Sequence, residues 1–175
     1  MKNLLSVCLL LTCLFPLLGQ DQFVPSPVNP QSVCDETSEL LEKKRGMENE
    51  TFTFLNQKRI EKGLEPLRWS EELAKIARLH SENMAKFKFF SHVDLDQNTV
   101  IERAKSLGIK QWKAIGENIG YVRSVSNVVV SLYEAWMESE PHRKNIFSSR
   151  YKETGIGIAI AEDGTYYFTQ VFVER

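Results

Sequence analysis

Apolar positions recur every three or four residues through the middle of the chain, which is the period of a helix with one buried face. The clearest repeat follows Ser70, a favourable N-cap residue that two glutamates follow. We therefore predict a helix from Ser70 to about residue 87. The positions that share its buried face are Leu73, Ile76, Ala77, His80, Met84 and Phe87.

Three further segments have a helical pattern, and each ends at a glycine or a proline that would stop a helix. They are residues 52–62 before Gly63, residues 98–107 before Gly108, and residues 125–139 before Pro141. The last of these helices carries one stripe of side chains: Val129, Leu132, Trp136 and Ser139.

The last third of the chain changes to short apolar and aromatic runs that are typical of strands. Residues 155–161 and 165–173 flank Glu162-Asp163-Gly164, which is a favourable hairpin turn. Helices therefore come first and strands last, which predicts an α+β domain whose hairpin is covered by helices. The length of 175 residues, with 42% apolar and 26% charged residues, is typical of one soluble domain.

Residues 1–20 have the composition of an export signal. Lys2 is their one charged residue, and the apolar run over residues 4–18 is too short, and too interrupted by proline, to favour a membrane span. We predict a cleaved signal peptide and a protein that is secreted or retained in the cell envelope. Cys13 also suggests a lipoprotein anchor, but Thr12 stands where the usual lipobox has a small residue, so cleavage is the preferred interpretation.

Residues 21–35 contain three prolines and no hydrophobic periodicity, whereas the charged residues 39–45 are compatible with a short helix. We predict an extended linker over residues 21–47 before a domain over residues 48–175. Loss of the signal peptide would leave Cys34 as the one cysteine, so this domain would be held by its core and not by an internal disulfide. The net charge of the chain is −1 and there is no basic block, which argues against nucleic acid as a partner.

Four short patterns then occur in a distinctive order. They are Phe90-Ser91-His92, Gly116-Glu117-Asn118-Ile119, the segment from Trp136 through Pro141-His142-Arg143 to Ile146, and Gly155-Ile156-Gly157 followed by residues 166–172. Each is weak by itself, but the ordered set resembles the CAP superfamily, the SCP-like extracellular domains of plant pathogenesis-related, animal cysteine-rich secretory and exported bacterial proteins. The resemblance extends from about Phe52 to the end, and the scarcity of cysteine favours a bacterial-type member.

The resemblance implies a three-layer α-β-α sandwich with a central, mainly antiparallel sheet. It also implies a polar cleft in which two histidines and acidic residues sometimes hold zinc or another divalent ion. His92, His142 and Glu117 match those positions and are the candidate metal ligands, and Glu117 is also the candidate catalytic base. Ser139 stands where the family commonly has a second glutamate, three residues after Trp136, so we expect at most a weakly bound ion such as zinc.

Several neighbours are candidates for supporting roles. Asn118, Ser139 and Gln170 would lie beside the histidines and orient them, whereas the helical spacing of His80 places it in the core. The alternative is that the two histidines form structural hydrogen bonds only. The aromatic residues of the predicted strands and of the last predicted helix are likewise expected to lie in the core, and the alternative is that they line a lipid groove. These residues are Trp136, Tyr166, Phe168 and Phe172.

Three function classes fit these features. We expect a monomeric extracellular binding module for a lipid, glycan or protein, and not an enzyme. The second class is a metal-dependent, peptidase-like hydrolase in which Glu117 takes a proton from water on an ion held by His92 and His142. The third is a structural surface protein. A membrane would be a partner only through a lipid anchor.

Overall fold

The computed structural model describes residues 30–175, with side chains from Thr37 onward. The predicted signal peptide lies outside these residues. Helices and strands follow one another as α1 (Pro30–Glu61), β1 (Arg68–Trp69), α2 (Glu71–Phe87), α3 (Val100–Ser106), β2 (Ala114–Val122), α4 (Val128–Glu138), α5 (Glu140–Ile146), β3 (Glu153–Ile160) and β4 (Tyr166–Glu174).

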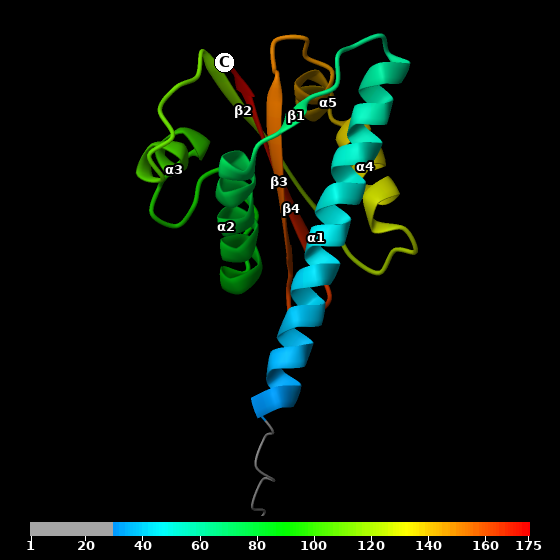
Figure 1. The fold of residues 1–175 in the computed structure, drawn as a ribbon, viewed down its shortest axis with the longest axis vertical. Coiled ribbons are helices and arrows are strands. Elements are labelled where there is room, and N and C mark those ends of the chain that lie inside the picture. Colours follow the sequence, from blue (N-terminus) through cyan, green and yellow to red (C-terminus); the bar gives the residue numbers. More distant parts are fainter. Residues whose placement is uncertain (1–29) are drawn as a thin grey trace, which may run out of the picture.

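The strands form one sheet in the order β1-β3-β4-β2 (Figure 1). Strands β3 and β4 are the predicted hairpin, and Gly164 in its turn has a φ of +80°, which glycine adopts without strain. Strand β2 is antiparallel to β4, whereas β1 pairs in parallel with the first two residues of β3. The prediction of a mainly antiparallel sheet is therefore confirmed.

Helices cover both faces of this sheet, with α2 and α3 on one face and α1, α4 and α5 on the other (Figure 1). Because side chains alternate along a strand, each face has its own core. The core under α1, α4 and α5 includes Trp136, Ile156, Ile158, Phe168 and Phe172. The core under α2 and α3 includes Leu73, Ile76, Ala77, Val171 and Val173. The three-layer α-β-α sandwich is confirmed, and so is the core role of Trp136, Phe168 and Phe172.

Close packing of α2 on the sheet depends on two glycines of β3. A Cβ atom on Gly155 would lie 2.0 Å from the backbone nitrogen of Ala74, and one on Gly157 would lie 2.0 Å from that of Arg78. No side chain fits at either position unless the helix moves. The two glycines therefore set the distance between α2 and β3.

The predicted caps explain where α2 and α3 begin. The Ser70 hydroxyl accepts a hydrogen bond from the backbone of Leu73, so α2 starts at Glu71 as expected. Helix α3 starts at Val100, two residues later than predicted, because Thr99 and Glu102 form a capping box.

The prediction of an extended linker up to residue 47 is wrong from Pro30 onward, where α1 begins. Proline has no N–H to lose in the first turn of a helix, so Pro30 starts a helix and does not prevent one. The inner part of this stretch is also tied to α2: Lys44 lies 3.5 Å from Glu82, and the adjoining buried Glu48 lies 2.7 Å from Arg78.

Two elements beside the site were not predicted. Strand β2 was missed because Gly116 and Gly120 interrupt its apolar pattern; its nine residues pair along the whole length of β4. Helix α5 was missed because we placed Pro141 after a helix end. The chain does leave α4 at Ser139, which has extended dihedral angles, but Pro141 then lies in the first turn of α5.

Candidate functional site

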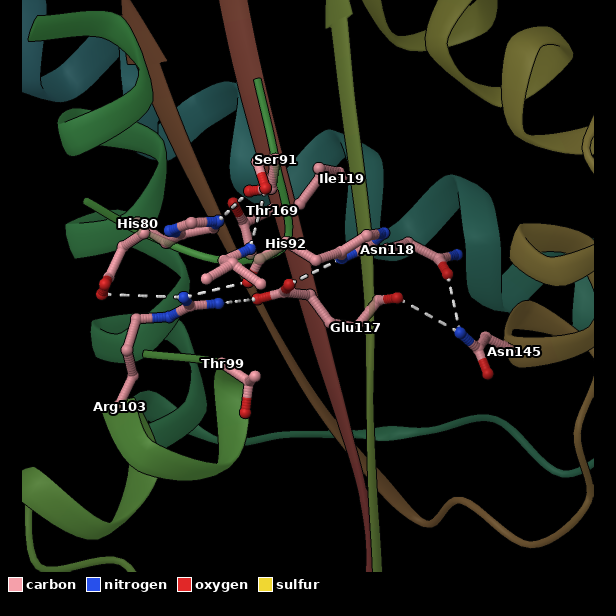
Figure 2. Close-up of polar contacts among 12 residues, drawn as sticks. His80, Ser91, His92, Thr99, Arg103, Glu117, Asn118, Ile119, Asn145 and Thr169 are labelled. Carbon is pink, nitrogen blue, oxygen red and sulfur yellow. Dashed lines mark hydrogen bonds and ion pairs between the residues drawn. The ribbon is translucent and has the colours of Figure 1, made fainter. Parts of the chain in front are cut away.

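Three elements bring the two histidines and the glutamate together around strand β2. His92 lies in the loop after α2, Glu117 on β2, and His142 in the first turn of α5. The Nδ1 atom of His92 lies 2.8 Å from Oε1 of Glu117, and the His92 and His142 rings lie 6.3 Å apart between centroids. Figure 2 shows His92 and Glu117 facing each other. The predicted residues therefore do form one cluster.

Glu117 is buried, and both of its carboxylate oxygens are engaged. His92 Nδ1–H donates to Oε1, and the Nη2 group of Arg103 donates to Oε2 at 2.6 Å (Figure 2). The Arg103 guanidinium is itself buried and lies 3.8 Å from a second carboxylate, that of Asp94. Glu117 is thus the centre of a buried ion pair with Arg103, and this pair holds the ring of His92.

The backbone around His92 is fixed from two sides. Arg103 Nη1 donates to the carbonyl oxygens of His92, at 3.2 Å, and Asn98, at 2.8 Å. Since a carboxylate only accepts, Nδ1 of His92 carries a proton whether the ring is neutral or charged. The side chain of His92 is nevertheless 52% exposed, and no described residue bonds its Nε2. The structure therefore presents Nε2 of a fixed imidazole to solvent.

His142 is held through its backbone. The Asn118 side chain donates to the His142 carbonyl at 3.1 Å, and Asn145 donates to Oδ1 of Asn118 at 2.9 Å. Burial lowers the pKa of the His142 imidazole, and the nearby His92 lowers it further. This ring consequently favours the neutral form, which can accept a hydrogen bond from a ligand.

A metal ion with three protein ligands does not fit this arrangement. Among the side chains that the structure describes, from Thr37 to Arg175, no three histidines, cysteines, aspartates or glutamates form a group that could hold an ion. Both oxygens of Glu117 already accept a hydrogen bond, from His92 and from Arg103, and the Arg103 guanidinium beside them repels a cation. At most the two imidazoles of His92 and His142 are free to act as metal ligands.

The other predicted supporting residues lie in different surroundings. Ser139 joins α4 to α5, and its side chain makes no capping hydrogen bond. Gln170 lies opposite Asn118 in the sheet, but its side chain is buried and donates to Thr154 at 3.2 Å, so it bonds within the core and not with the histidines. Among the three predicted supporting residues, Asn118 alone contacts the site.

Two residues of the site, Arg103 and Asn145, were not predicted. Arg103 appears in the sequence only as one polar residue of a short helix, and nothing local marks it as buried. Asn145 stands within the quoted motif around His142, so its proximity could have been foreseen from that pattern. His80 is buried in the core as predicted, and its Nε2 lies 2.9 Å from the carbonyl oxygen of Ser91, next to His92.

Exposed aromatic rings continue from the site along β2. Tyr121 lies on the same face of the strand as Glu117, four residues further on, and is 56% exposed. The ring of Phe90, 47% exposed and two residues before His92, packs edge-on against it at 4.9 Å between centroids. The half-buried Tyr167 of β4 lies 6.2 Å from Tyr121 between ring centroids. The three rings form an aromatic strip of Phe90, Tyr121 and Tyr167.

Residues 52–172 match the sequence profile of the cysteine-rich secretory protein family, CAP. The chain belongs to the CAP family. The motifs that suggested this family are the ones that carry His92, Glu117 and His142. The family match covers all three of these residues and also Ser139.

Known relatives and solved structures agree with this assignment. YkwD of Bacillus subtilis is 36% identical over 128 residues, 73% of this chain and 47% of YkwD. YlbC of the same organism, described as an uncharacterized membrane protein, is 32% identical over 85% of this chain and 40% of its own length. The chain thus spans less than half of either relative. Within residues 30–175, no helix is long and apolar enough to cross a membrane.

Among solved structures, an extracellular SCP-domain protein of Bacillus anthracis superposes with a TM-score of 0.68 at 25% identity, over 86% of this chain and 45% of that one. A cysteine-rich secretory protein of Staphylococcus aureus gives 0.60 at 25% identity, over 77% and 40%. An outer surface protein of Borrelia burgdorferi shares the fold, with a TM-score of 0.63 at 16% identity over 71% and 89%. The similarity to bacterial SCP domains was expected from the sequence.

Proposed function

We propose that this CAP protein is an extracellular binding module whose ligand contacts the imidazoles of His92 and His142 together with the aromatic strip. The observation that carries the proposal is the exposed, fixed ring of His92 beside exposed Phe90 and Tyr121. Large aromatic side chains that stay exposed next to ordered polar groups are typical of binding surfaces. The extracellular location is supported by the apolar segment at residues 1–20 and by the described location of the B. anthracis protein.

We infer that the ligand is a glycan. Phe90 and Tyr121 are exposed, Phe90 lies two residues before His92, and the His92 ring lies 6.3 Å from that of His142, so a ligand that contacts this surface must offer both an apolar face and hydrogen-bonding groups. A sugar ring has both, whereas a lipid chain needs an enclosed apolar site. The Tyr121 and Tyr167 hydroxyls bond no other described residue, which leaves them able to bond sugar hydroxyls.

The hydrolase alternative has less support. Its proton acceptor, Glu117, would need an oxygen directed at a substrate water, but His92 and Arg103 engage both oxygens. A general base must reach the proton that it removes. A weakly held ion between His92 and His142 stays a prediction, with no role for Glu117 as its ligand.

Binding of the full chain to separated envelope fractions tests the proposal. The fractions would be soluble glycan oligomers, lipid vesicles and solubilised envelope proteins, and affinity would be measured by calorimetry. We expect saturable binding to a glycan, weakened at least about tenfold by Tyr121→Ala and by His92→Ala, because truncation of a central hot-spot side chain typically costs about 2 kcal/mol or more and a tenfold loss corresponds to about 1.4 kcal/mol.

Leu79→Ala is the matched control, since Leu79 is also a large exposed apolar residue but lies on the outer side of α2. It should leave the affinity unchanged. Saturable binding to vesicles alone, or to an envelope protein alone, would contradict the glycan proposal and identify a lipid or a protein as the ligand. Binding that is insensitive to both Tyr121→Ala and His92→Ala would show that the surface is not the binding site.

A further inference from the structure

His80 is a fully buried histidine on α2, outside the cluster of His92, Glu117 and His142. Its Nε2 lies 2.9 Å from the backbone oxygen of Ser91. Figure 2 draws this hydrogen bond as a dashed line. A carbonyl oxygen can only accept, so Nε2 carries the proton and donates. Its other nitrogen, Nδ1, is buried and has no hydrogen-bond partner in the described part of the chain.

The bond to Ser91 fixes the peptide that leads directly into His92. The donor to the carbonyl oxygen of Ser91 is His80, a buried residue of α2 that lies 11 residues earlier in the chain. The next carbonyl, that of His92 itself, accepts from Arg103 of α3, and the His92 ring donates to Glu117 of β2. Three separate elements thus hold one exposed residue in place.

We propose that His80 is a positioning residue, whose donor to Ser91 holds the loop of residues 88–93 and so presents His92 and Phe90 to a ligand. Lys88 begins this loop with a left-handed φ of +55°, so the chain turns sharply away from α2 there. The backbone hydrogen bonds of α2 end at this turn, and the side chain of His80 provides a further tie between helix and loop. The role of this loop in presenting residues to a ligand rests on the proposed binding function. The role of His80 in holding the loop does not depend on that function.

The surroundings of His80 favour a neutral donor. Arg103 of α3 faces it with a positive charge, while Glu117 of β2 and Asp94 of the following loop face it with negative ones. Burial lowers the pKa of His80 and Arg103 lowers it further, while the two carboxylates and the hydrogen bond to Ser91 only partly oppose this. A neutral ring with its proton on Nε2 satisfies Ser91 and places no second cation beside Arg103.

Two substitutions separate the donor from the ring. His80→Phe keeps an aromatic ring against Phe89 but has no N–H, while His80→Gln loses the ring but carries an amide N–H that reaches the former position of Nε2. Hydrogen exchange of residues 88–93 and the imidazole nitrogen signals of His92 would be measured for each. We expect His80→Phe to raise exchange in this loop about tenfold and to broaden the His92 signals. His80→Gln should stay within about twofold of the parent.

Ser81→Ala is the matched control, because Ser81 is equally buried on α2 but bonds Gly157 and Thr169 of the sheet and not the loop. It should leave exchange in residues 88–93 unchanged. Equal exchange in the Phe and Gln variants, or an equal rise in Ser81→Ala, would overturn the proposal. If His80→Phe does not fold, His80→Asn replaces it, since its amide is too short to reach Ser91. Because no ligand is used, this result is independent of whether the glycan binds.

Discussion

Glu117 combines a buried negative charge with the orientation of an exposed histidine. Its pairing with Arg103 compensates two charges that would otherwise be costly to bury. The same carboxylate accepts from His92, so that the ring is directed without being enclosed. The site thus consists of the exposed imidazole of His92, held by the buried ion pair of Glu117 and Arg103.

Because Glu117 is buried and His92 is exposed, substitutions at these two positions should lower the free energy of unfolding by different amounts. Glu117→Gln leaves the Arg103 guanidinium buried without its closest carboxylate and should lower the free energy of unfolding by about 3 kcal/mol. His92→Ala removes an exposed ring and should cost less than about 1 kcal/mol. Urea denaturation of both variants measures the difference. Similar small losses would mean that Arg103 finds compensation elsewhere.

The residues of the site were only partly predictable from sequence. The order of the motifs predicted that His92, Glu117 and His142 lie in one site, because that order identified the fold. Arg103 was not foreseen, since its burial depends on α3 folding back over β2, which no local pattern encodes. Gln170 was misplaced for a related reason: strand alternation gives the face of a residue but not its bonding partner.

Among the elements, the long helix α1 was the least predictable and α2 the most. Helix α2 has a clear cap and a clear apolar stripe. The first half of α1 is polar and prolines precede it, so the composition favoured a linker over a helix. Strand β2 needed its partner β4 to be recognised, because glycines break its pattern.

The contact of α2 with β3 can be tested at Gly157. Gly157→Ala should destabilise the fold by about 2–3 kcal/mol, because the new methyl group must displace the backbone of α2. Gly46→Ala is the control: Gly46 lies in α1 with open space around it, so alanine should stabilise by about 0.5–1 kcal/mol. Thermal unfolding compares them. A neutral effect of Gly157→Ala would show that α2 does not pack as closely as described.

The N-terminal part of α1 is predicted to be dispensable for folding. Helix α1 is tied to the domain by Lys43, which donates to Tyr166 at 3.1 Å, and by the ion pairs of Lys44 with Glu82 and of Glu48 with Arg78, all of which lie after Asp35. A chain that starts at Asp35 should therefore unfold cooperatively with a nearly unchanged midpoint. A chain that starts at Asn49 loses the Glu48–Arg78 ion pair and should melt lower. A large drop already in the longer chain would show that residues before Asp35 pack on the domain.

For the whole molecule, stability should depend on pH through His80 and His142. Burial lowers the pKa of both in the folded state, so the unfolded chain binds protons first as pH falls below about 6.5. The stabilisation is fully present above that pH and is lost as pH falls toward the folded pKa values. The slope is at most about 1.4 kcal/mol per pH unit for each histidine. His142 should contribute less than fully buried His80, because solvent screens it.

Denaturant unfolding between pH 7.5 and 5 measures this dependence. The range avoids the carboxylates whose pKa is lowered by hydrogen bonds, such as Glu71 and Glu102, because these lose stabilisation only at more acidic pH. His80→Gln cannot titrate and should flatten the curve. A parent protein equally stable at pH 7.5 and 5 would contradict the neutral, buried state of His80.

The central claim is that Glu117 orients His92 and does not bind a metal. Long-range proton–nitrogen spectra of the imidazoles in the full chain test it most directly, recorded with and without added zinc. We predict that neutral His92 is a single tautomer with its proton on Nδ1 and that Glu117→Gln disturbs this state. Zinc, if it binds, should coordinate Nε2 of His92 and the ring of His142 and leave the proton on Nδ1 of His92. A proton on Nε2 of His92, or zinc coordinated through Nδ1 with loss of the Glu117 contact, would contradict the account.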